Sequence, residues 1–225
     1  MKDIKDTYDN EAKIYAFTSR QVTPFYDLAL DKLVESLPVR KRVLDVCCGT
    51  GILTRRICEK MPEAFVLGVD LSSGMLEVLK KNLLLKNVSF VCCDILDLDK
   101  KGQKEESFDL AVSSFGIHNI HTKKAKIKAL KNIALMLKKG GLFFCCDYLL
   151  GKDKAEIDKF TKIEIEHLKK SFDEKEIKEW TSLLAEEDDP ETWENNKILL
   201  EKAGFGKIKL VWQKDFLAVW CAEKL

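Results

Sequence analysis

The sequence predicts an α/β fold in which a parallel sheet ends in an antiparallel hairpin. Apolar, strand-like segments alternate with helical ones from residue 42 to 147, which is typical of βαβ units. The first strand runs into a turn that contains Gly49 and Gly51 and opens directly into a helical pattern. Near the carboxyl end, the runs Ile208–Trp212 and Phe216–Trp220 are separated by three residues and predict a hairpin.

The individual elements follow from apolar periodicity and from turn residues. Two helical stretches are expected near 3–18 and 23–37, separated around Thr23-Pro24. Strands are expected after them near 42–47, 64–70, 88–93, 108–114 and 141–147. Helices are expected near 51–60, 73–86 and 122–138. Gly140-Gly141 is expected to end the last of these helices after a lysine-rich turn. Residues 152–187 have apolar positions at helical spacing and predict a helical insertion. A further helix from Glu191 to Ala203 ends at Gly204.

Composition indicates a globular chain with a sizeable core. The 225 residues are 46% apolar and 33% charged, and are most simply organised as one domain. Lysine and arginine number 38 and aspartate and glutamate 37, so the net charge of +1 does not suggest a dedicated nucleic-acid binder. The amino terminus is too polar for a signal peptide, and no apolar run approaches the roughly 20 residues of a membrane span. We therefore expect a cytoplasmic protein without a membrane partner.

The eight cysteines suggest neither a disulfide framework nor a metal site. Six form the adjacent pairs Cys47-Cys48, Cys92-Cys93 and Cys145-Cys146, each at or near the end of an apolar strand. Neighbouring strand residues point to opposite faces, so an adjacent pair does not easily chelate one ion. We expect small apolar strand residues in a reducing compartment and no metal. A structural metal, or redox sensitivity of the thiol beside the glycine turn, are the alternatives.

Three carboxylates lie where predicted strands end. Asp45 belongs to the first strand's turn. Asp70 follows the second strand 19 residues beyond Gly51, where an acid can accept both hydroxyls of a ribose. Asp94 closes the third strand, within reach of an adenine amino group. Singly, each could be a helix N-cap or a loop residue. Together they predict an adenosine site along one edge of the sheet.

The turn Asp45-x-Cys47-x-Gly49-x-Gly51 differs from the dinucleotide fingerprint G-x-G-x-x-G, because it lacks a third glycine and begins with an acid. A carboxylate here would repel a pyrophosphate and attract an ammonium or sulfonium group. The turn therefore favours an adenosine that carries an amino acid over NAD.

These segments resemble the class I S-adenosylmethionine-dependent methyltransferases over nearly the whole chain. The matching segments, in order, are Val43-Leu-Asp-Val-Cys-Cys-Gly-Thr-Gly51, Gly68-Val-Asp-Leu-Ser-Ser-Gly-Met-Leu76, Cys92-Cys-Asp94, Ser107-Phe-Asp-Leu-Ala-Val112, Leu137-Lys-Lys-Gly-Gly141 and Ala203-Gly-Phe205. The resemblance implies a Rossmann-like seven-stranded sheet of order 3-2-1-4-5-7-6, with the last strand antiparallel and helices on both faces. It also implies S-adenosyl-L-methionine as the cofactor. Cys47 stands where the family's turn has its first glycine.

The resemblance also implies roles for single residues. Asp45 would attract the methionyl ammonium group, backbone near Gly49 and Gly51 would line the methionine portion, Asp70 would hold the ribose and Asp94 the adenine amine. Ser113 or Ser114 would close the pocket. The full set expected to bind the donor is Asp45, Cys47, Gly49, Gly51, Asp70, Leu71, Met75, Asp94, Ile95 and Ser113.

The acceptor side is less determined by the sequence. Methyl transfer from a sulfonium requires an acceptor held on axis, and a base only if that acceptor must lose a proton. His118, just past the fourth strand and with an unperturbed pKa near 6.5, is the candidate base; alternatively it packs or caps the next helix. Tyr15 is expected to close over the donor, or else to belong to the core. Asp147 and Tyr148 are expected to contact the acceptor.

We expect a single domain over 1–225, made of a helical cap (1–38), a donor-binding core (39–147), a helical lid insertion (148–190) and a terminal helix with a β-hairpin (191–225). The leading function is methyl transfer from S-adenosyl-L-methionine to O, N or C of a small molecule, by a monomer or homodimer. Likenesses to quinone-biosynthesis C-methyltransferases, in Ser114–Ile120, and to carboxymethoxyuridine tRNA enzymes, in the tail, disagree about the substrate. The alternatives are modification of a tRNA wobble uridine and a non-catalytic S-adenosylmethionine-binding regulator. Hydride transfer with NAD ranks last.

Overall fold

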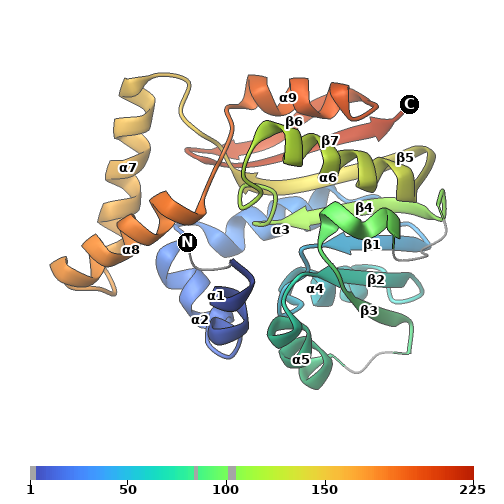
Figure 1. Ribbon diagram of the computed structural model, residues 1–225, viewed down its shortest axis with the longest axis horizontal. Coiled ribbons are helices and arrows are strands. Elements are labelled where there is room, and N and C mark those ends of the chain that lie inside the picture. The colour runs from blue at the N-terminus through green and yellow to red at the C-terminus, as the bar shows by residue number, and fades with distance from the viewer. Residues whose placement is uncertain (1–3, 84–85, 101–104) are drawn as a thin grey trace.

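The computed structural model describes residues 4–83, 86–100 and 105–225, and its central element is a seven-stranded sheet of order β3-β2-β1-β4-β5-β7-β6 (Figure 1). The strands are β1 (Arg42–Val46), β2 (Phe65–Asp70), β3 (Val88–Cys92), β4 (Phe108–Ser114), β5 (Leu137–Tyr148), β6 (Phe205–Lys214) and β7 (Leu217–Lys224). β1 to β5 pair in parallel, whereas β7 runs antiparallel between β5 and β6. The predicted strand order and the terminal hairpin are confirmed.

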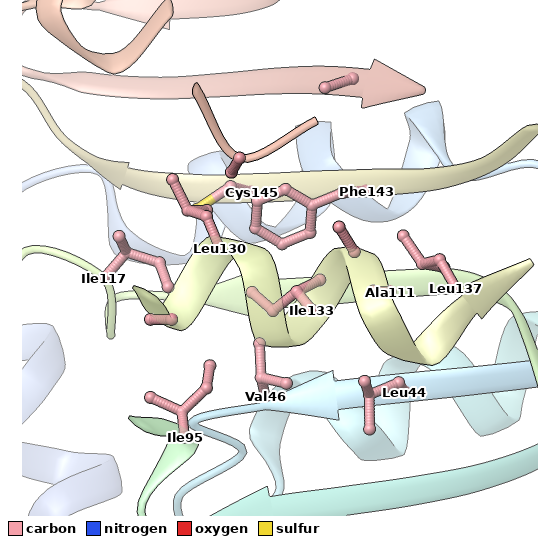
Figure 2. Packing of buried hydrophobic residues seen from close by; sticks show 14 of the residues in the cluster. Leu44, Val46, Ile95, Ala111, Ile117, Leu130, Ile133, Leu137, Phe143 and Cys145 are labelled. Carbon is pink, nitrogen blue, oxygen red and sulfur yellow. The ribbon is translucent and has the colours of Figure 1, made fainter. Parts of the chain in front are cut away.

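Helices cover both faces of this sheet because its strand residues are buried alternately on one side and the other. Leu44 and Ala111 pack toward α6 (Lys123–Met136), α9 (Trp193–Lys202) and the 3-10 helix η1 (Ile95–Lys100). Val43 and Leu110 pack toward α3 (Tyr26–Ser36), α4 (Ile52–Lys60) and α7 (Lys154–Leu168). Figure 2 shows the first of these interfaces, with side chains of α6 lying over those of β1, β4 and β5.

The paired cysteines follow the same alternation. Cys145 belongs to the cluster under α6, and its neighbour Cys146 belongs to the opposite cluster. All eight cysteines are free thiols. Within the described ranges, no group of three or more His, Cys, Asp or Glu residues could hold a metal ion.

The amino-terminal region forms three helices, so the prediction of one helix over 3–18 is wrong. The described part of that stretch is split into α1 (Ile4–Glu11) and α2 (Tyr15–Val22), while residue 3 lies outside the described residues. In a continuous helix, Tyr8 and Tyr15 would lie seven residues and therefore about 10 Å apart along the axis. The break between the helices lets their rings meet edge to face, with centroids 5.9 Å apart.

The end of α6 also differs from the prediction. The helix stops at Met136, before Gly140-Gly141, because Leu137 adopts an extended conformation (φ −76°, ψ 142°) and pairs with Phe108 as the first residue of β5. The Leu137 side chain is fully buried there. Residues expected in the last helical turn thus belong to a strand, and Gly140 takes a left-handed φ of +72° within it. α5 (Ser73–Asn82) likewise ends before 86, and residues 84–85 lie outside the described residues.

The insertion after β5 consists of α7 and α8 (Glu174–Glu187), and α8 begins with a capping box formed by Asp173 and Glu176. The chain then returns to the sheet through a bridge between Leu149 and Glu191. In Figure 1, α7 and α8 lie on the same side of the sheet as α1 and α2, beyond the carboxyl ends of β1, β4 and β5. None of the described helices has the length and apolarity needed to cross a membrane.

Gly51 gives a first test of this packing. It has a φ of +84°, and a Cβ there would lie 2.6 Å from Cγ of the fully buried Leu79. We expect Gly51→Ala to lower the free energy of unfolding by about 2–4 kcal/mol, because left-handed strain and overpacking add.

Gly140→Ala is the matched control, since Gly140 has a φ of +72° but no described atom within 4 Å of a would-be Cβ. It should lose only about 1–2 kcal/mol. Urea unfolding measures both values, and equal losses would contradict the close contact between Gly51 and α5.

Candidate active site

The turn from β1 into α4 forms the base of the site. Cys47, Gly49 and Gly51 all have a positive φ (+57°, +53° and +84°), so the chain reverses within a few residues. The Cys48 backbone N–H donates to the carbonyl of Val69 (3.1 Å), which ties the turn to β2. The turn therefore lies directly at the carboxyl edge of the sheet.

Asp45 lies beneath this turn and is fully buried. Its Oδ2 accepts a hydrogen bond from Thr54 Oγ1 (2.6 Å), whereas Oδ1 has no hydrogen-bond partner among the described residues. Burial raises the pKa of Asp45 to about 7, although the Thr54 bond opposes this shift. A buried carboxylate oxygen without a partner is costly unless something else binds it.

A cavity of about 710 Å³, part of it open to solvent, lies above the turn. Its lining residues are Tyr8, Tyr15, Cys47, Gly49, Val69, Asp70, Leu71, Met75, Cys93, Asp94, Ile95, Phe115, Gly116, Asn119 and Ile120. We call it the first cavity.

Asp70 closes β2 at the wall of the first cavity. Its Oδ2 accepts from the Gly49 N–H (2.8 Å) and its Oδ1 from the Ser72 N–H (2.9 Å). Burial raises the pKa of Asp70, while these backbone bonds oppose the shift. An ionised carboxylate has about four lone-pair sites, so each oxygen keeps one for a ligand hydroxyl.

Asp94 caps a helix and also lines the first cavity. Its Oδ1 accepts from the Leu96 N–H (2.8 Å), so it caps η1.

The structure brings together most of the residues that were expected to bind the donor. Cys47, Gly49, Asp70, Leu71, Met75, Asp94 and Ile95 line the first cavity, and so does Tyr15 from α2. Asp45, Gly51 and Ser113 do not line it. Asp45 and Ser113 are fully buried, Gly51 packs against Leu79, and the Ser113 hydroxyl has no hydrogen-bond partner among the described residues.

Cys47 and Gly116 depend on each other. A Cβ at Gly116 would lie 2.4 Å from Cβ of Cys47, so a side chain at one position requires its absence at the other. Burial raises the pKa of the Cys47 thiol well above its usual value, and the nearby aspartates add to the shift. The residue therefore stays a thiol, which is not the electropositive setting of a redox-sensitive cysteine.

A second cavity, of about 620 Å³, adjoins the first, and Tyr8, Tyr15 and Phe115 line both. The other lining residues are Thr18, Ser19, Val22, Thr23, Tyr26, His118, Tyr148, Trp180, Leu183, Leu184, Glu187 and Asp188. The amino-terminal helices and the insertion therefore enclose it together.

His118 is buried in the wall of the second cavity between two carboxylates. Its Nδ1 is hydrogen-bonded to Asp147 Oδ1, and its Nε2 lies 3.5 Å from Asp188 Oδ1. Burial alone would lower the pKa of His118, but the two carboxylates outweigh it and raise the pKa to about 10. The two carboxylates thus favour the imidazolium form of His118, and its role as a base stays a prediction.

Asp147 supports His118 and does not face the acceptor side, which corrects the prediction. It does not line either cavity and is 1% exposed. Its Oδ2 accepts from the backbone N–H groups of Ile117 (2.9 Å) and His118 (3.1 Å), and its Oδ1 from that of Tyr148 (2.9 Å). Tyr148 does line the second cavity, where its hydroxyl is bonded to Thr23.

Asp9 attaches α1 to the start of α5, beside the first cavity. Its Oδ1 accepts from Ser72 Oγ (2.5 Å) and from the Gly74 N–H (2.7 Å) at the first turn of α5. The Ser72 bond is the main cause that lowers the pKa of Asp9 to about 2. A Cβ at Gly74 would meet the Asp9 carbonyl oxygen at 2.8 Å, so the contact is close.

Sequence reasoning assigned no role to Asp9, Tyr8, Phe115, Asn119 or Asp188. Phe115 and Asn119 follow β4 at the edge where ligands bind in open α/β sheets, so topology could have indicated them. Tyr8, which accepts a hydrogen bond from Asn119 Nδ2 (3.0 Å), and Asp188 reach the site from distant segments, so their place in it depends on the tertiary structure.

Comparisons with known proteins agree with this architecture. Residues 43–141 match the family model described as a methyltransferase domain. The chain is 33% identical over 139 residues to malonyl-[acyl-carrier protein] O-methyltransferase of Priestia megaterium, covering 60% of this chain and 49% of that protein. It is 32% identical over 150 residues to demethylmenaquinone methyltransferase of Staphylococcus aureus, covering 65% and 57%. The chain thus spans about half the length of the curated relatives it matches.

Among solved structures, phosphoethanolamine N-methyltransferase 2 of Haemonchus contortus superimposes with a TM-score of 0.68 at 18% identity, covering 100% of this chain and 60% of that one. At this identity the likeness concerns the fold. The sheet order defines a Rossmann-like α/β fold, and residues 43–141 of this fold resemble a methyltransferase domain.

The raised pKa of His118 predicts how stability depends on pH. The pKa of about 10 in the folded protein lies above the ordinary histidine pKa of 6.5, so the stabilisation is complete below about pH 6.5 and is lost as the pH rises toward 10. Each pH unit in that window removes at most about 1.4 kcal/mol. Urea unfolding of the wild type should show this decline, and His118→Gln should flatten it; an equal slope in the variant would contradict the charged imidazole.

The contact between Cys47 and Gly116 predicts a coupled pair of substitutions. Gly116→Ala alone should lower the melting temperature by several degrees, because its Cβ overlaps that of Cys47. Cys47→Gly removes this obstacle and a left-handed non-glycine residue, so the double variant should melt above Gly116→Ala. Additive effects in the double-mutant cycle would show that the two sites are independent.

Proposed function

We propose that the protein is an S-adenosyl-L-methionine-dependent methyltransferase acting on a small-molecule acceptor. The observation that carries this proposal is the pair of adjoining cavities, which share the wall formed by Tyr8, Tyr15 and Phe115. One cavity has the carboxylates of an adenosine site, and the other has room for an acceptor. Methyl transfer requires this arrangement, because donor and acceptor must meet in line away from water.

The residues present fit the donor. Asp70 offers two carboxylate oxygens for ribose hydroxyls, and Asp94 with Ile95 offers a wall for the adenine. Above Gly49 the space that a Cβ would fill is open. Asp45 and Ser113 are buried at the same edge without lining the cavity, so they would support the turn and would not touch the methionyl group. When bound, S-adenosyl-L-methionine supplies an activated methyl group; the Haemonchus contortus protein was solved with this molecule.

The chain's own residues would then position the acceptor and exclude water. We assign Tyr15 and Tyr8 to the partition between the cavities, where burial raises the pKa of both phenols and keeps them neutral. His118, oriented by Asp147, would form a fixed cationic wall of the second cavity. In this proposal, residues 1–38 act as a cap and 148–190 as a lid over a donor-binding core at 39–147, with 191–225 completing the sheet.

The alternative functions receive less support. Among the described residues that line the two cavities there is no lysine or arginine to pair with a nucleic-acid phosphate or a carboxylated donor. That argues against modification of a tRNA uridine. A non-catalytic regulator would not need an acceptor cavity of this size beside the donor site.

Donor binding tests the proposal directly. Calorimetric titration should show binding of S-adenosyl-L-methionine and none of NAD. Asp70→Ala should weaken the first affinity at least about tenfold, since it removes charge-assisted bonds to the ribose.

Asp97→Ala is the matched control, because Asp97 lies nearby in η1 but is an exposed member of surface ion pairs. Its affinity for the donor should not change. Binding of NAD in place of S-adenosyl-L-methionine would overturn the proposed function.

A further inference from the structure

Resting on the proposed methyltransferase function, we propose that the acceptor is an organic amine, bound in the second cavity as its ammonium form beside Asp188 and Glu187. The carboxylates, the aromatic walls and one buried hydroxyl of this cavity each favour that chemistry. The product would be the N-methylated amine.

The charge of the cavity wall is negative. Glu187 and Asp188 line it from the end of α8, against the single cation His118. The His118 charge is already flanked by Asp147 on its far side. Of the described lining residues, none is lysine or arginine. The buried Lys126 of α6 does not line this cavity. Its ammonium is paired with Asp189 (2.7 Å) and with the Ile120 carbonyl (2.6 Å).

Aromatic rings make up much of the rest of the wall, which is the environment that holds ammonium groups through cation–π attraction. These rings are Tyr8, Tyr15, Tyr26, Phe115, Tyr148 and Trp180. Burial raises the pKa of all four tyrosines, so their faces are those of neutral phenols. A carboxylate or phosphate ester would find only His118 as a counter-ion, and that imidazole is already flanked by Asp147 and Asp188.

Ser19 adds a polar group to this wall. It lines the second cavity, is only 6% exposed, and its hydroxyl interacts with the Tyr26 phenol, which lines the same cavity. A hydroxyl oxygen can accept an ammonium N–H.

A third cavity, of about 980 Å³ and partly open to solvent, continues from the second past Tyr148, Leu184 and Asp188, which line both. Its walls include Ile157, Phe160 and Phe216. An acceptor with its amine at Asp188 could therefore place an apolar body against α7. This geometry narrows the acceptor to an amine with a hydrophobic substituent.

Every bond and proton of the proposed reaction is accounted for by the amine, the methyl donor and Asp188. The ammonium gives one proton to the Asp188 carboxylate, and the freed nitrogen lone pair forms the bond to the transferred methyl carbon. The electron pair of the broken carbon–sulfur bond stays on sulfur, which becomes a neutral thioether. The methylated nitrogen carries the positive charge, and the proton on Asp188 leaves to solvent.

The first test uses a trideuteromethyl-labelled donor with a cellular metabolite extract, separated afterwards on cation- and anion-exchange resins at neutral pH. We expect the labelled product in the fraction that binds the cation exchanger. Label confined to neutral or anionic fractions would overturn the amine assignment while leaving the methyltransferase intact. Absence of label from every fraction would contradict the proposed function itself.

The second test measures binding without turnover. Calorimetry on protein saturated with S-adenosylhomocysteine compares phenethylamine with 3-phenylpropanoate, which is similar in size and opposite in charge. The amine should bind at least about tenfold more tightly. Equal affinities, or tighter binding of the carboxylate, would also overturn the assignment.

A pair of variants locates the effect. Asp188→Asn should weaken phenethylamine binding at least about tenfold and leave the affinity for S-adenosyl-L-methionine within about twofold, which also reports that the variant is folded. Glu186→Gln removes the same charge from an exposed position of α8 outside the cavities and should change neither affinity. If both variants bind phenethylamine like the wild type, Asp188 does not hold the amine.

Discussion

The carboxylate of Asp147 is the interaction on which the arrangement of the site depends. It accepts hydrogen bonds from the backbone of Ile117, His118 and Tyr148 and from the His118 ring, so its lone-pair sites are filled by its own chain. These bonds fix the segment after β4 against the end of β5. That segment contributes Phe115 and Gly116 to the first cavity and His118 to the second. One buried side chain thereby sets the boundary of both.

The sheet supplies one side of each cavity, and segments outside the sheet supply the other. The turn after β1, the end of β2 and the start of η1 provide the carboxylates and open backbone of the first cavity. The second cavity is closed by α2 and α8, which are more than 150 residues apart in the chain. In proteins of this architecture, different closing segments on the same sheet can select different acceptors.

Much of the fold could be predicted from the sequence because it depends on local periodicity. The strands, and the residues Asp70 and Asp94 that line the first cavity, follow from apolar runs and from the acids that end them. The strand order came from a resemblance of motifs. By contrast, the break before Tyr15 and the early end of α6 at Met136 depend on tertiary contacts, a ring pair in one case and a strand partner in the other.

The site was predictable only where a single segment carries the chemistry. The charge of His118 is set by Asp147 and Asp188, which are 29 and 70 residues away in the chain, so no local pattern contains it. Asp147 was placed at the correct edge, but its direction depends on which backbone N–H groups reach it. For Cys47, the sequence showed that a cysteine stands where the family has a glycine. It did not show that the missing side chain of Gly116 makes room for the Cys47 side chain.

The attachment of α1 through Asp9 affects how ligands enter and leave the two cavities. Tyr8 is the neighbour of Asp9, and the ring it contributes separates the two cavities. One part of the partition therefore belongs to a helix docked onto α5, whereas Tyr15 and Phe115 supply the rest from α2 and from the end of β4. A motion that lifts α1 from α5 would withdraw the Tyr8 ring from both cavities at once, so one contact would influence how ligands enter and leave each of them.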